Sequence, residues 1–417
     1  MKLIYRAYPR SLSMHFSKYF RRRHPGLSGV SCLRGGLVFT LLCSLLLAGC
    51  SSNDTEDQEP AELVDFKPER YFDKVWSESV GDGQGGVYNN LKPAIYNGVV
   101  YAAAADGTVE AVTLDEGDDK WDVDLDEKLV GGVGVSSNYV MVGTATGEVV
   151  VLDRNDGKEL WRKQVGGEVL AAPQSNERMV FVQTFDGQML GLDAKDGKRL
   201  WSYRNTMPVL TLRGTSSPLM FQDSVIAGFA NGHVISFDMD TGEVRWNTRV
   251  SVAKGDSEIE RIVDIDGAML ETGSLLYAVS YRGKIAAIEP VSGNRVWINE
   301  ASSYVGMSQG FGNIYVSDAD GTVTAFDERG QGVRWAQSVL ARRELTGSAT
   351  MGSYVVVGDA EGYLHALSQV DGHIAARTRV DSDGLRVDVQ ASGDTLIVYS
   401  NDGELAAYQL VEKKSWF

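Results

Sequence analysis

The sequence has few of the residues that build reactive or metal-binding centres. Its 417 residues include nine prolines, five histidines and only three cysteines, Cys32, Cys43 and Cys50. Because no cysteine follows residue 50, the long remainder of the chain contains neither a disulfide nor a thiolate metal site. The three histidines of this remainder are scattered without the spacing of metal ligands.

Sequence signatures of common enzyme classes are also missing. No glycine-rich phosphate loop leads from a strand into a helix, and no nucleophile elbow is evident. The segment DADG, residues 318–321, is similar to part of a calcium loop, but the remaining ligands of such a loop are absent. We therefore expect no catalytic residue, no metal site and no bound cofactor.

The charge is divided unevenly along the chain. Residues 1–49 contain eight lysines and arginines and no acidic residue, which leaves 32 basic and 56 acidic residues in the remainder, a net charge of −24. So acidic a body would repel phosphates, which argues against nucleic acid as a partner. The same charge favours solubility and association with basic surfaces.

The basic start leads into an apolar run, LVFTLLCSLLLAGC, at residues 37–50. A cationic region, about ten apolar residues and a site of small residues are typical of a secretory signal, and a membrane-spanning helix needs roughly 20 apolar residues. An uncleaved anchor is the alternative interpretation. The ending Leu-Ala-Gly-Cys favours cleavage, because it resembles the bacterial lipobox, whose cysteine is alkylated with diacylglycerol and then acylated at its freed amine. That resemblance implies lipidation of Cys50, and Ser51 at the next position implies the outer membrane.

We predict four parts of the chain. Residues 1–49 are the signal, and residues 50–65 are a lipidated, acidic and flexible tether that includes the polar stretch SSNDTEDQEPAE. A folded body occupies residues 66–410. It is followed by a tail at 411–417, whose Trp416 has no assigned role.

Internal repeats define the folded body. In six segments a glycine precedes a tryptophan by fourteen residues: Gly107 and Trp121, Gly147 and Trp161, Gly187 and Trp201, Gly232 and Trp246, Gly283 and Trp297, Gly321 and Trp335. A seventh copy starts at Gly362 but has Ala376 in place of the tryptophan, and an eighth starts at Gly403 and reaches the chain end first. Within the copies, turn residues such as Asp-Gly and Asn-Gly separate alternating apolar runs, which predicts four strands in each.

Four-stranded units of about 40 residues, repeated radially, are typical of an all-β protein with the β-propeller fold. Trp76 precedes the first full copy, so its segment can supply the outer strand that is missing after Gly403. The N- and C-terminal strands then pair in one blade, which closes a ring of eight blades and removes two free edges. We interpret the repeated tryptophans as packing between blades.

Two neighbouring connections are longer than the others. The spacings between the repeat glycines are 40, 40, 45, 51, 38, 41 and 41 residues, and both excesses follow the tryptophan. Each excess therefore lies between the outer strand of one blade and the inner strand of the next, so both should project side by side from one face. Insertions in repeat proteins often form the binding face. The junction GDGQGGVYNNLKP, residues 81–93, is also long, but its glycines indicate flexibility more than recognition.

The two insertions combine apolar, basic and acidic side chains. The first contains VLTLRG and the second EIERIVDID. Leu210 and Leu212 with Arg213, beside an acidic cluster, predict a protein-binding patch, because interface hot spots are enriched in arginine and large side chains. The alternative is an internal role, in which Arg213 forms a salt bridge with Asp264 or Asp266 and fixes the loops.

The lipobox, the acidic tether, the eight repeats and the motifs LTLRG and EIERIVDID together resemble BamB, the lipoprotein family of the β-barrel assembly machinery in Gram-negative outer membranes. The resemblance covers essentially the whole chain after the signal. It implies a periplasm-facing propeller that binds the POTRA domains of the central barrel subunit BamA, works with the accessory lipoproteins and aids insertion of outer-membrane proteins. The partner-binding residues that it implies are Leu210, Leu212, Arg213, Asp264 and Asp266. A further expectation is that exposed sheet edges receive strands of unfolded outer-membrane proteins by β-augmentation.

The repeat LDAKDGKRLW is also similar to the tryptophan-docking motif of alcohol dehydrogenases that use pyrroloquinoline quinone (PQQ), which are eight-bladed propellers as well. Those enzymes need a calcium site, a catalytic aspartate and usually a vicinal cysteine pair, and no cysteine pair follows residue 50. We therefore expect a scaffold without enzymatic activity. The PQQ-dependent enzyme is the alternative, and a binder of carbohydrate or peptide in the central channel is a third reading.

Overall fold

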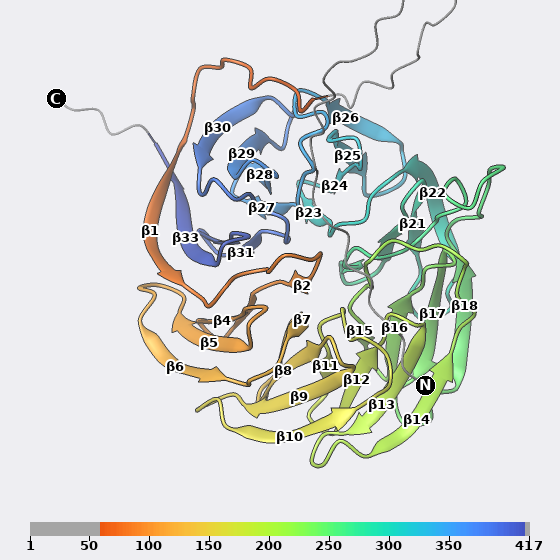
Figure 1. Cartoon of the computed structure of the whole chain (residues 1–417). Coiled ribbons are helices and arrows are strands. Elements are labelled where there is room, and N and C mark those ends of the chain that lie inside the picture. The colour runs from red at the N-terminus through yellow and green to blue at the C-terminus, as the bar shows by residue number, and fades with distance from the viewer. Residues whose placement is uncertain (1–58, 413–417) are drawn as a thin grey trace, which may run out of the picture. The chain divides into compact units, whose positions relative to one another are not determined.

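The computed structural model describes residues 59–412, which fold into strands joined by turns and irregular connections. Figure 1 shows these strands as sheets arranged in a ring. Within this range, no helix has the length and apolar character needed to span a bilayer. The predicted signal, the predicted lipidation site Cys50 and Trp416 lie outside the described residues.

The described residues form eight sheets, and the predicted eight-bladed β-propeller is confirmed. From the inner to the outer strand, blade 1 contains β3 (Ala94–Tyr96), β4 (Val99–Ala103), β5 (Thr108–Thr113) and β6 (Asp119–Asp124). Blade 2 contains β7 (Leu129–Val135), β8 (Tyr139–Thr144), β9 (Glu148–Asp153) and β10 (Glu159–Gln164). Blade 3 contains β11 (Gln174–Ser175), β12 (Met179–Gln183), β13 (Gln188–Asp193) and β14 (Arg199–Arg204). Blade 4 contains β15 (Leu219–Phe221), β16 (Ser224–Gly228), β17 (His233–Asp238) and β18 (Val244–Arg249).

The remaining blades follow the same order. Blade 5 contains β19 (Leu270–Glu271), β20 (Leu276–Val279), β21 (Gly283–Ile288) and β22 (Arg295–Ala301). Blade 6 contains β23 (Ser308–Gly310), β24 (Asn313–Ser317), β25 (Val323–Asp327) and β26 (Val333–Gln337). Blade 7 contains β27 (Ala349–Met351), β28 (Tyr354–Gly358), β29 (Tyr363–Ser368) and β30 (Ile374–Arg379). Blade 8 contains β31 (Gln390–Ser392), β32 (Thr395–Tyr399), β33 (Glu404–Val411) and β1 (Tyr71–Ser79).

Blade 8 closes the ring by pairing the two ends of the folded chain. The outer strand β1 runs antiparallel to β33, in a register that extends from Tyr71 opposite Val411 to Ser79 opposite Glu404. Figure 1 shows the orange β1 beside the blue β33. The strand that contains Trp76 therefore supplies the missing outer strand, as predicted, and the backbone hydrogen bonds of this pair take the place of two free edges.

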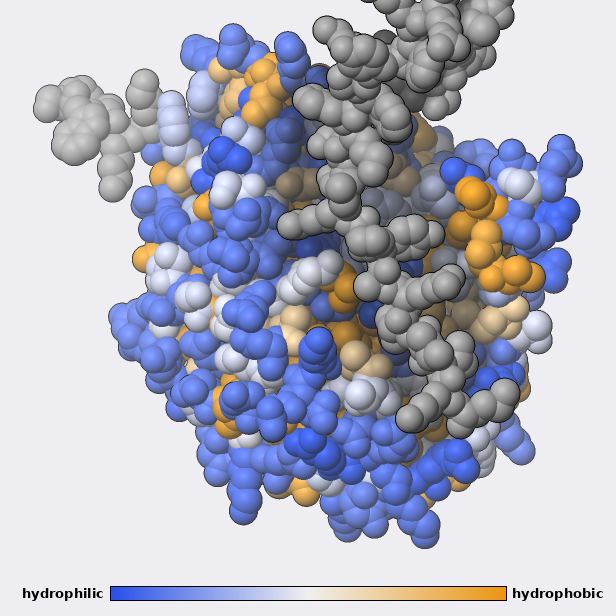
Figure 2. Space-filling model, in the orientation of Figure 1, coloured by the Kyte–Doolittle hydropathy of each residue, from blue (hydrophilic) through white to orange (hydrophobic). Residues whose placement is uncertain are grey.

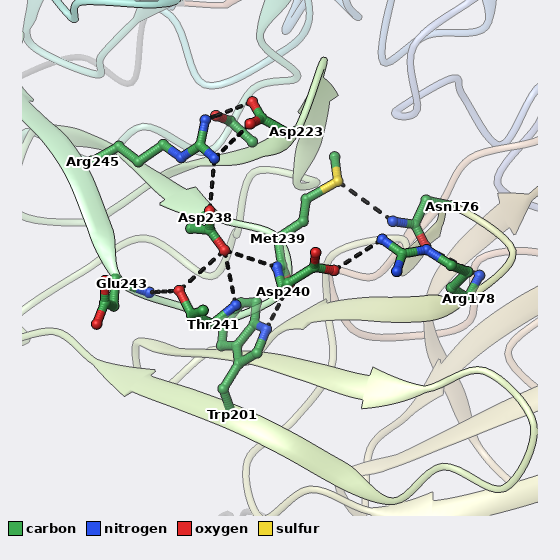
Figure 3. A network of polar contacts seen from close by, with 11 residues as sticks. Asn176, Arg178, Trp201, Asp223, Asp238, Met239, Asp240, Thr241, Glu243 and Arg245 are labelled. Atoms are coloured by element: carbon green, nitrogen blue, oxygen red, sulfur yellow. Dashed lines mark hydrogen bonds and ion pairs between the residues drawn. The ribbon is translucent and has the colours of Figure 1, made fainter.

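A tryptophan on the outer strand of a blade contacts the next blade. Trp201 Nε1 donates a hydrogen bond to the carbonyl oxygen of Met239 at 2.8 Å, and Figure 3 shows the indole directed at the turn that carries Met239, Asp240 and Thr241. Seven tryptophans make this bond at 2.8–3.1 Å, and their acceptors are the carbonyls of Leu114, Arg154, Ala194, Met239, Pro290, Glu328 and Gln369. Packing between blades, which the sequence predicted for these residues, is confirmed.

Each of these rings lies against a glycine of the same turn. Gly242 has a φ of +71°, and a Cβ at this position would lie 2.5 Å from Cδ2 of Trp201. Glycine is required twice over, because it accepts the left-handed backbone of the turn and leaves the space that the indole fills. The same contact joins Gly117 to Trp76, Gly157 to Trp121, Gly197 to Trp161, Gly293 to Trp246, Gly330 to Trp297 and Gly372 to Trp335.

Ala376 in β30 is the exception in this row, and the closure of the ring explains it. In the next blade, β33 and β1 come from opposite ends of the chain, so no turn joins them and no glycine is available for an indole. The N-terminal segment takes this place: the backbone nitrogens of Glu69 and Arg70 donate to the carbonyl of Ala375 at 2.9 and 3.3 Å.

The long junction between β1 and β3, named here the crossing segment (residues 81–93), is bonded rather than flexible. Its short strand β2 (Asn90–Leu91) pairs in parallel with β7, as Figure 1 shows, and the Leu91 side chain is fully buried. The Gln84 side chain donates to the carbonyl of Leu91 at 2.9 Å, and Lys92 Nζ lies 3.4 Å from Asp388 Oδ2. The flexibility predicted from its glycines is wrong, because the segment is hydrogen-bonded, and Gly83 allows a close approach to the backbone of Asn401 and Gly403.

Two glycines of blade 7 allow the effect of a positive φ to be measured apart from the effect of contact with an indole. A Cβ at Gly372 (φ +78°) would lie 2.5 Å from Trp335 Cε3, whereas a Cβ at Gly352 (φ +55°) would meet nothing within 4 Å. We expect Gly352→Ala to lower the free energy of unfolding by about 1 kcal/mol through backbone strain. Gly372→Ala should cost about 2 kcal/mol more, because the indole must move. Urea denaturation measures both values, and equal losses would contradict the assigned contact.

Candidate protein-binding site

Two long connections meet on one face of the ring. The first insertion, residues 205–218, joins β14 to β15, and the second insertion, residues 250–269, joins β18 to β19. Both lead from an outer strand to the inner strand of the next blade. They lie side by side as predicted, because the Leu212 backbone nitrogen donates to Asp264 Oδ2 at 2.6 Å.

The Asp264 side chain joins the two insertions. Its Oδ2 accepts hydrogen bonds from Thr211 Oγ1 and the Leu212 nitrogen, and the side chain is fully buried. The Asp264 carbonyl accepts a bond of 2.9 Å from the nitrogen of Tyr281, which ties the second insertion to blade 5. Burial raises the pKa of Asp264 to about 6, while its two hydrogen bonds act in the opposite direction.

Asp266 packs against Gly214 of the first insertion. A Cβ at Gly214 would lie 2.6 Å from Asp266 Cγ, so only glycine allows this approach. Burial first, and then the charge of Asp264, raise the pKa of Asp266 well above its ordinary value. Both aspartates are therefore interior groups that fix the loops, and the exposed acids of the second insertion are Glu258 and Glu260 among others.

Arg213 is held by two segments that sequence reasoning did not connect with it. Its Nη1 forms an ion pair with Glu168, in the connection between β10 and β11, and its Nε donates to the carbonyl of Tyr88 at 2.9 Å. Arg213 thus forms an internal salt bridge, as the alternative predicted, but its partner is Glu168 and not Asp264 or Asp266. The sequence held one signal for Glu168: its connection joins an outer strand to the next inner strand, as the first insertion does one repeat later. No such signal marked Tyr88, because the glycines of its segment predict flexibility.

Apolar side chains are exposed on both insertions. Val209 is 82% exposed and Leu210 is 43% exposed in the first, and Val252 and Ile259 are exposed in the second. Figure 2 shows a group of hydrophobic residues at the right-hand edge, where Figure 1 places the green connection after β18, within a largely hydrophilic surface. Sequence reasoning did not single out Val252 or Ile259; Ile259 stands between two glutamates, and Val252 follows the last strand of its repeat.

A cavity of about 430 Å³ lies beside the first insertion. Its lining includes Leu212, Arg213 and Asp266 from the predicted set, together with Tyr88 and Tyr304. Leu210 does not line it and is exposed to solvent instead. A partner therefore meets the exposed Val209 and Leu210 next to a cavity that contains the Arg213 guanidinium. This arrangement suits a protruding segment of another protein.

Comparisons with known proteins agree with this architecture. The family described as outer membrane protein assembly factor BamB matches residues 105–337 and 319–415. An outer membrane protein assembly factor BamB from Pseudomonas aeruginosa is 56% identical over 370 residues, which cover 89% of this chain and 97% of that protein. The crystal structure of BamB from Moraxella catarrhalis superposes with a TM-score of 0.75 at 28% identity, covering 81% of this chain and 99% of that one. A quinohemoprotein alcohol dehydrogenase from Comamonas testosteroni (TM-score 0.65, 14% identity, covering 82% and 76% of the two chains) shares the fold alone.

The buried Asp264 gives the stability a pH dependence that a variant can isolate. Its pKa of about 6 lies above the ordinary value of 3.8, so the native state binds more protons than the unfolded state between these values. Stability should therefore fall as the pH rises from about 4 to 7, by up to about 3 kcal/mol from this group. Asp264→Asn lacks the titrating proton, so urea denaturation across this range should show a flatter profile than the unsubstituted protein. Parallel profiles would contradict the burial of Asp264.

Proposed function

This chain belongs to the BamB family of outer membrane protein assembly factors, and from this premise we propose that it is a lipid-anchored scaffold on the periplasmic side of the outer membrane. Membership makes it a component of the machinery that assembles outer-membrane proteins. In our proposal, Cys50 carries the lipid, and the surface formed by the two insertions binds the POTRA domains of the central barrel subunit BamA. Accessory lipoproteins and unfolded outer-membrane proteins are its further contacts.

The observation that carries the proposed binding surface is the fixed presentation of Leu210 beside Arg213. Leu210 is half exposed although it belongs to an internally bonded loop, and Arg213 is oriented by Glu168 and Tyr88 while about a third of its side chain stays accessible. A preorganised apolar group next to a preorganised cation binds with a smaller loss of conformational entropy than a mobile loop does.

The two aspartates have a different role in this proposal. Because Asp264 is buried, it acts on a partner only through the position of Leu212, whose nitrogen it binds. Asp266 fixes the position of Gly214, against which it packs, and it also lines the cavity. Both are therefore positioning residues, whereas Leu210, Leu212 and Arg213 are the residues that meet the partner.

We propose that the propeller works without catalysis. Its relatives at high identity are described as assembly factors, and its likeness to a quinoprotein dehydrogenase extends to the fold at 14% identity. The regular blades serve as a rigid support for the insertions, and the differences between blades are concentrated at the proposed binding surface.

Leu210→Ala tests the surface against a matched control. We expect it to weaken binding to the POTRA domains about tenfold, because truncating a central apolar side chain costs more than 1 kcal/mol at a hot spot. Leu200→Ala is the control, since Leu200 is 48% exposed on β14 of the same blade and lies outside the insertion. Co-purification from membranes and titration with purified POTRA domains measure the effect. Equal affinities of the two variants would refute the site.

The quinoprotein alternative has its own test. Purified protein mixed with PQQ and calcium should retain no stoichiometric quinone after gel filtration and should not reduce a dye acceptor with an alcohol as substrate. Retained quinone together with alcohol oxidation would overturn the scaffold assignment.

A further inference from the structure

A second cavity, of about 590 Å³, lies at the opposite end of the central channel from the two insertions. The inner strands of blades 5 to 8, which are β19, β23, β27 and β31, form its wall. Each inner strand starts from a connection on the insertion face, so its last residues lie at the other face. Because the lining continues to Thr272, just beyond the end of β19, the second cavity reaches that opposite face.

An ion pair separates the second cavity from the cavity beside Arg213. Lys92 and Asp388 line both cavities, and Lys92 Nζ lies 3.4 Å from Asp388 Oδ2. Asp388 Oδ1 accepts hydrogen bonds from the backbone nitrogens of Gly306 and Gly347 at 3.2 and 2.9 Å. The second cavity therefore ends at a fixed pair of charges that neutralise each other.

Two further carboxylates give the second cavity a net negative charge. Glu271 and Glu328 line it, and among residues 59–412 neither forms an ion pair with a lysine, arginine or histidine. Their hydrogen-bond donors are neutral: the Gln309 side chain binds Glu328 Oε2 at 3.2 Å, and the Gly273 nitrogen binds Glu271 Oε1. A cation is therefore the ligand that this cavity attracts.

Phe311 is exposed beside the second cavity, in a turn that does not suit it. The residue follows β23, whose Gln309 lines the cavity, and it is 62% exposed. Its φ is +51° and that of Gly312 is +72°, a left-handed pair that asparagine and glycine adopt more readily than a bulky residue. The same turn of blade 1 contains Asn97 and Gly98, with φ of +48° and +73°. The fold gains neither burial nor a relaxed backbone from Phe311, which points to a contact with another molecule.

We propose that the second cavity and Phe311 bind a basic segment of another protein. A lysine or arginine side chain of this segment enters the cavity, and an apolar neighbour packs against Phe311. The carboxylates of Glu271 and Glu328 select the cation, while Leu270 and Met307 of the lining contact its methylene groups. A small cation is disfavoured as the occupant, because it would leave Phe311 without a contact.

This site is independent of the proposed function, because it lies on the other face from Leu210 and Arg213. A propeller with a binding site at each end of its channel holds two proteins at once. The second partner is identified by its chemistry alone, as a protein with an exposed segment that combines basic and apolar side chains.

The probe for this site is the fluorescein-labelled heptapeptide Ser-Lys-Leu-Ser-Lys-Leu-Ser. Its counterpart has glutamate in place of both lysines. Fluorescence anisotropy with the full chain in detergent should show at least tenfold tighter binding of the basic peptide, with an affinity that falls as salt is added. Since the whole body is acidic, variants are needed to locate the binding.

Phe311→Asn separates a binding role from a structural one. The variant takes the turn residue of blade 1, so the midpoint of urea denaturation should stay the same or rise. Affinity for the basic peptide should nevertheless fall about tenfold, because the apolar anchor is lost. Val291→Asn is the control, since Val291 is also 62% exposed and lies in the turn between β21 and β22 on the same face. It should leave the affinity unchanged.

A pair of charge variants locates the cation. Glu271→Gln with Glu328→Gln removes both unpaired charges of the lining, so affinity for the basic peptide should fall about tenfold and depend less on salt. Asp115→Asn with Glu116→Gln removes the same charge from the exposed turn between β5 and β6, on the same face. This second variant should change the affinity less than twofold.

Two results would overturn the inference directly: an unchanged affinity of Phe311→Asn, or equal losses from the two charge variants, which would trace the attraction to the acidic body as a whole. Other occupants give results of their own, and each also overturns it. Tighter peptide binding after removal of residues 413–417, KKSWF, would assign the cavity to the chain's own tail. A dimer that Phe311→Asn dissociates would assign it to a second copy, and spermidine that binds as tightly as the peptide would assign it to a small cation. The titration of Leu210→Ala with POTRA domains is unaffected by any of these results.

Discussion

Seven of the eight contacts between neighbouring blades are made by an indole that rests on a glycine, and this contact sets the geometry of the ring. The indole nitrogen needs a carbonyl acceptor at about 3 Å, and the ring needs a turn without a side chain, so both partners must occur at fixed places in successive repeats. Where the chain ends meet, no turn exists to receive an indole. That single gap follows from the pairing of β1 with β33, and it accounts for Ala376 and for the backbone bonds from the N-terminal segment to Ala375.

A ring built in this way is uniform, so differences between blades become visible on its faces. The two long connections are the clearest difference, and they are not loose loops. Asp264 links them, Glu168 and Tyr88 orient Arg213, and the crossing segment supports them from the interior. The surface offered to a partner is therefore an extension of the rigid body, which suits a scaffold in an assembly machine.

Much of this architecture could be predicted from the sequence. The glycine-to-tryptophan spacing specified the blades, and the orphan Trp76 specified the closure, because both depend on local periodicity that repetition amplifies. The adjacency of the two insertions followed from their place between outer and inner strands. The burial of Asp264 and Asp266 did not follow, because a carboxylate is ordinarily exposed, although the apolar neighbours of both residues in IVDID were a signal for it. The partners of Arg213 lie 45 and 125 residues away, in a repeat connection and in a glycine-rich stretch, and no local pattern marks such contacts.

Residues 59–70, the N-terminal strap, are held by bonds from Arg342 and Arg343 to the carbonyls of Glu59 and Ala61 and lead directly into β1. Tension applied at Glu59 would first load the arginine bonds to the strap and only then reach Tyr71, the end of β1 that faces Val411. From there the hydrogen bonds between β1 and β33 would break in sequence toward Ser79. Force from this end would therefore reach the seam of the ring only after the guanidinium contacts had broken.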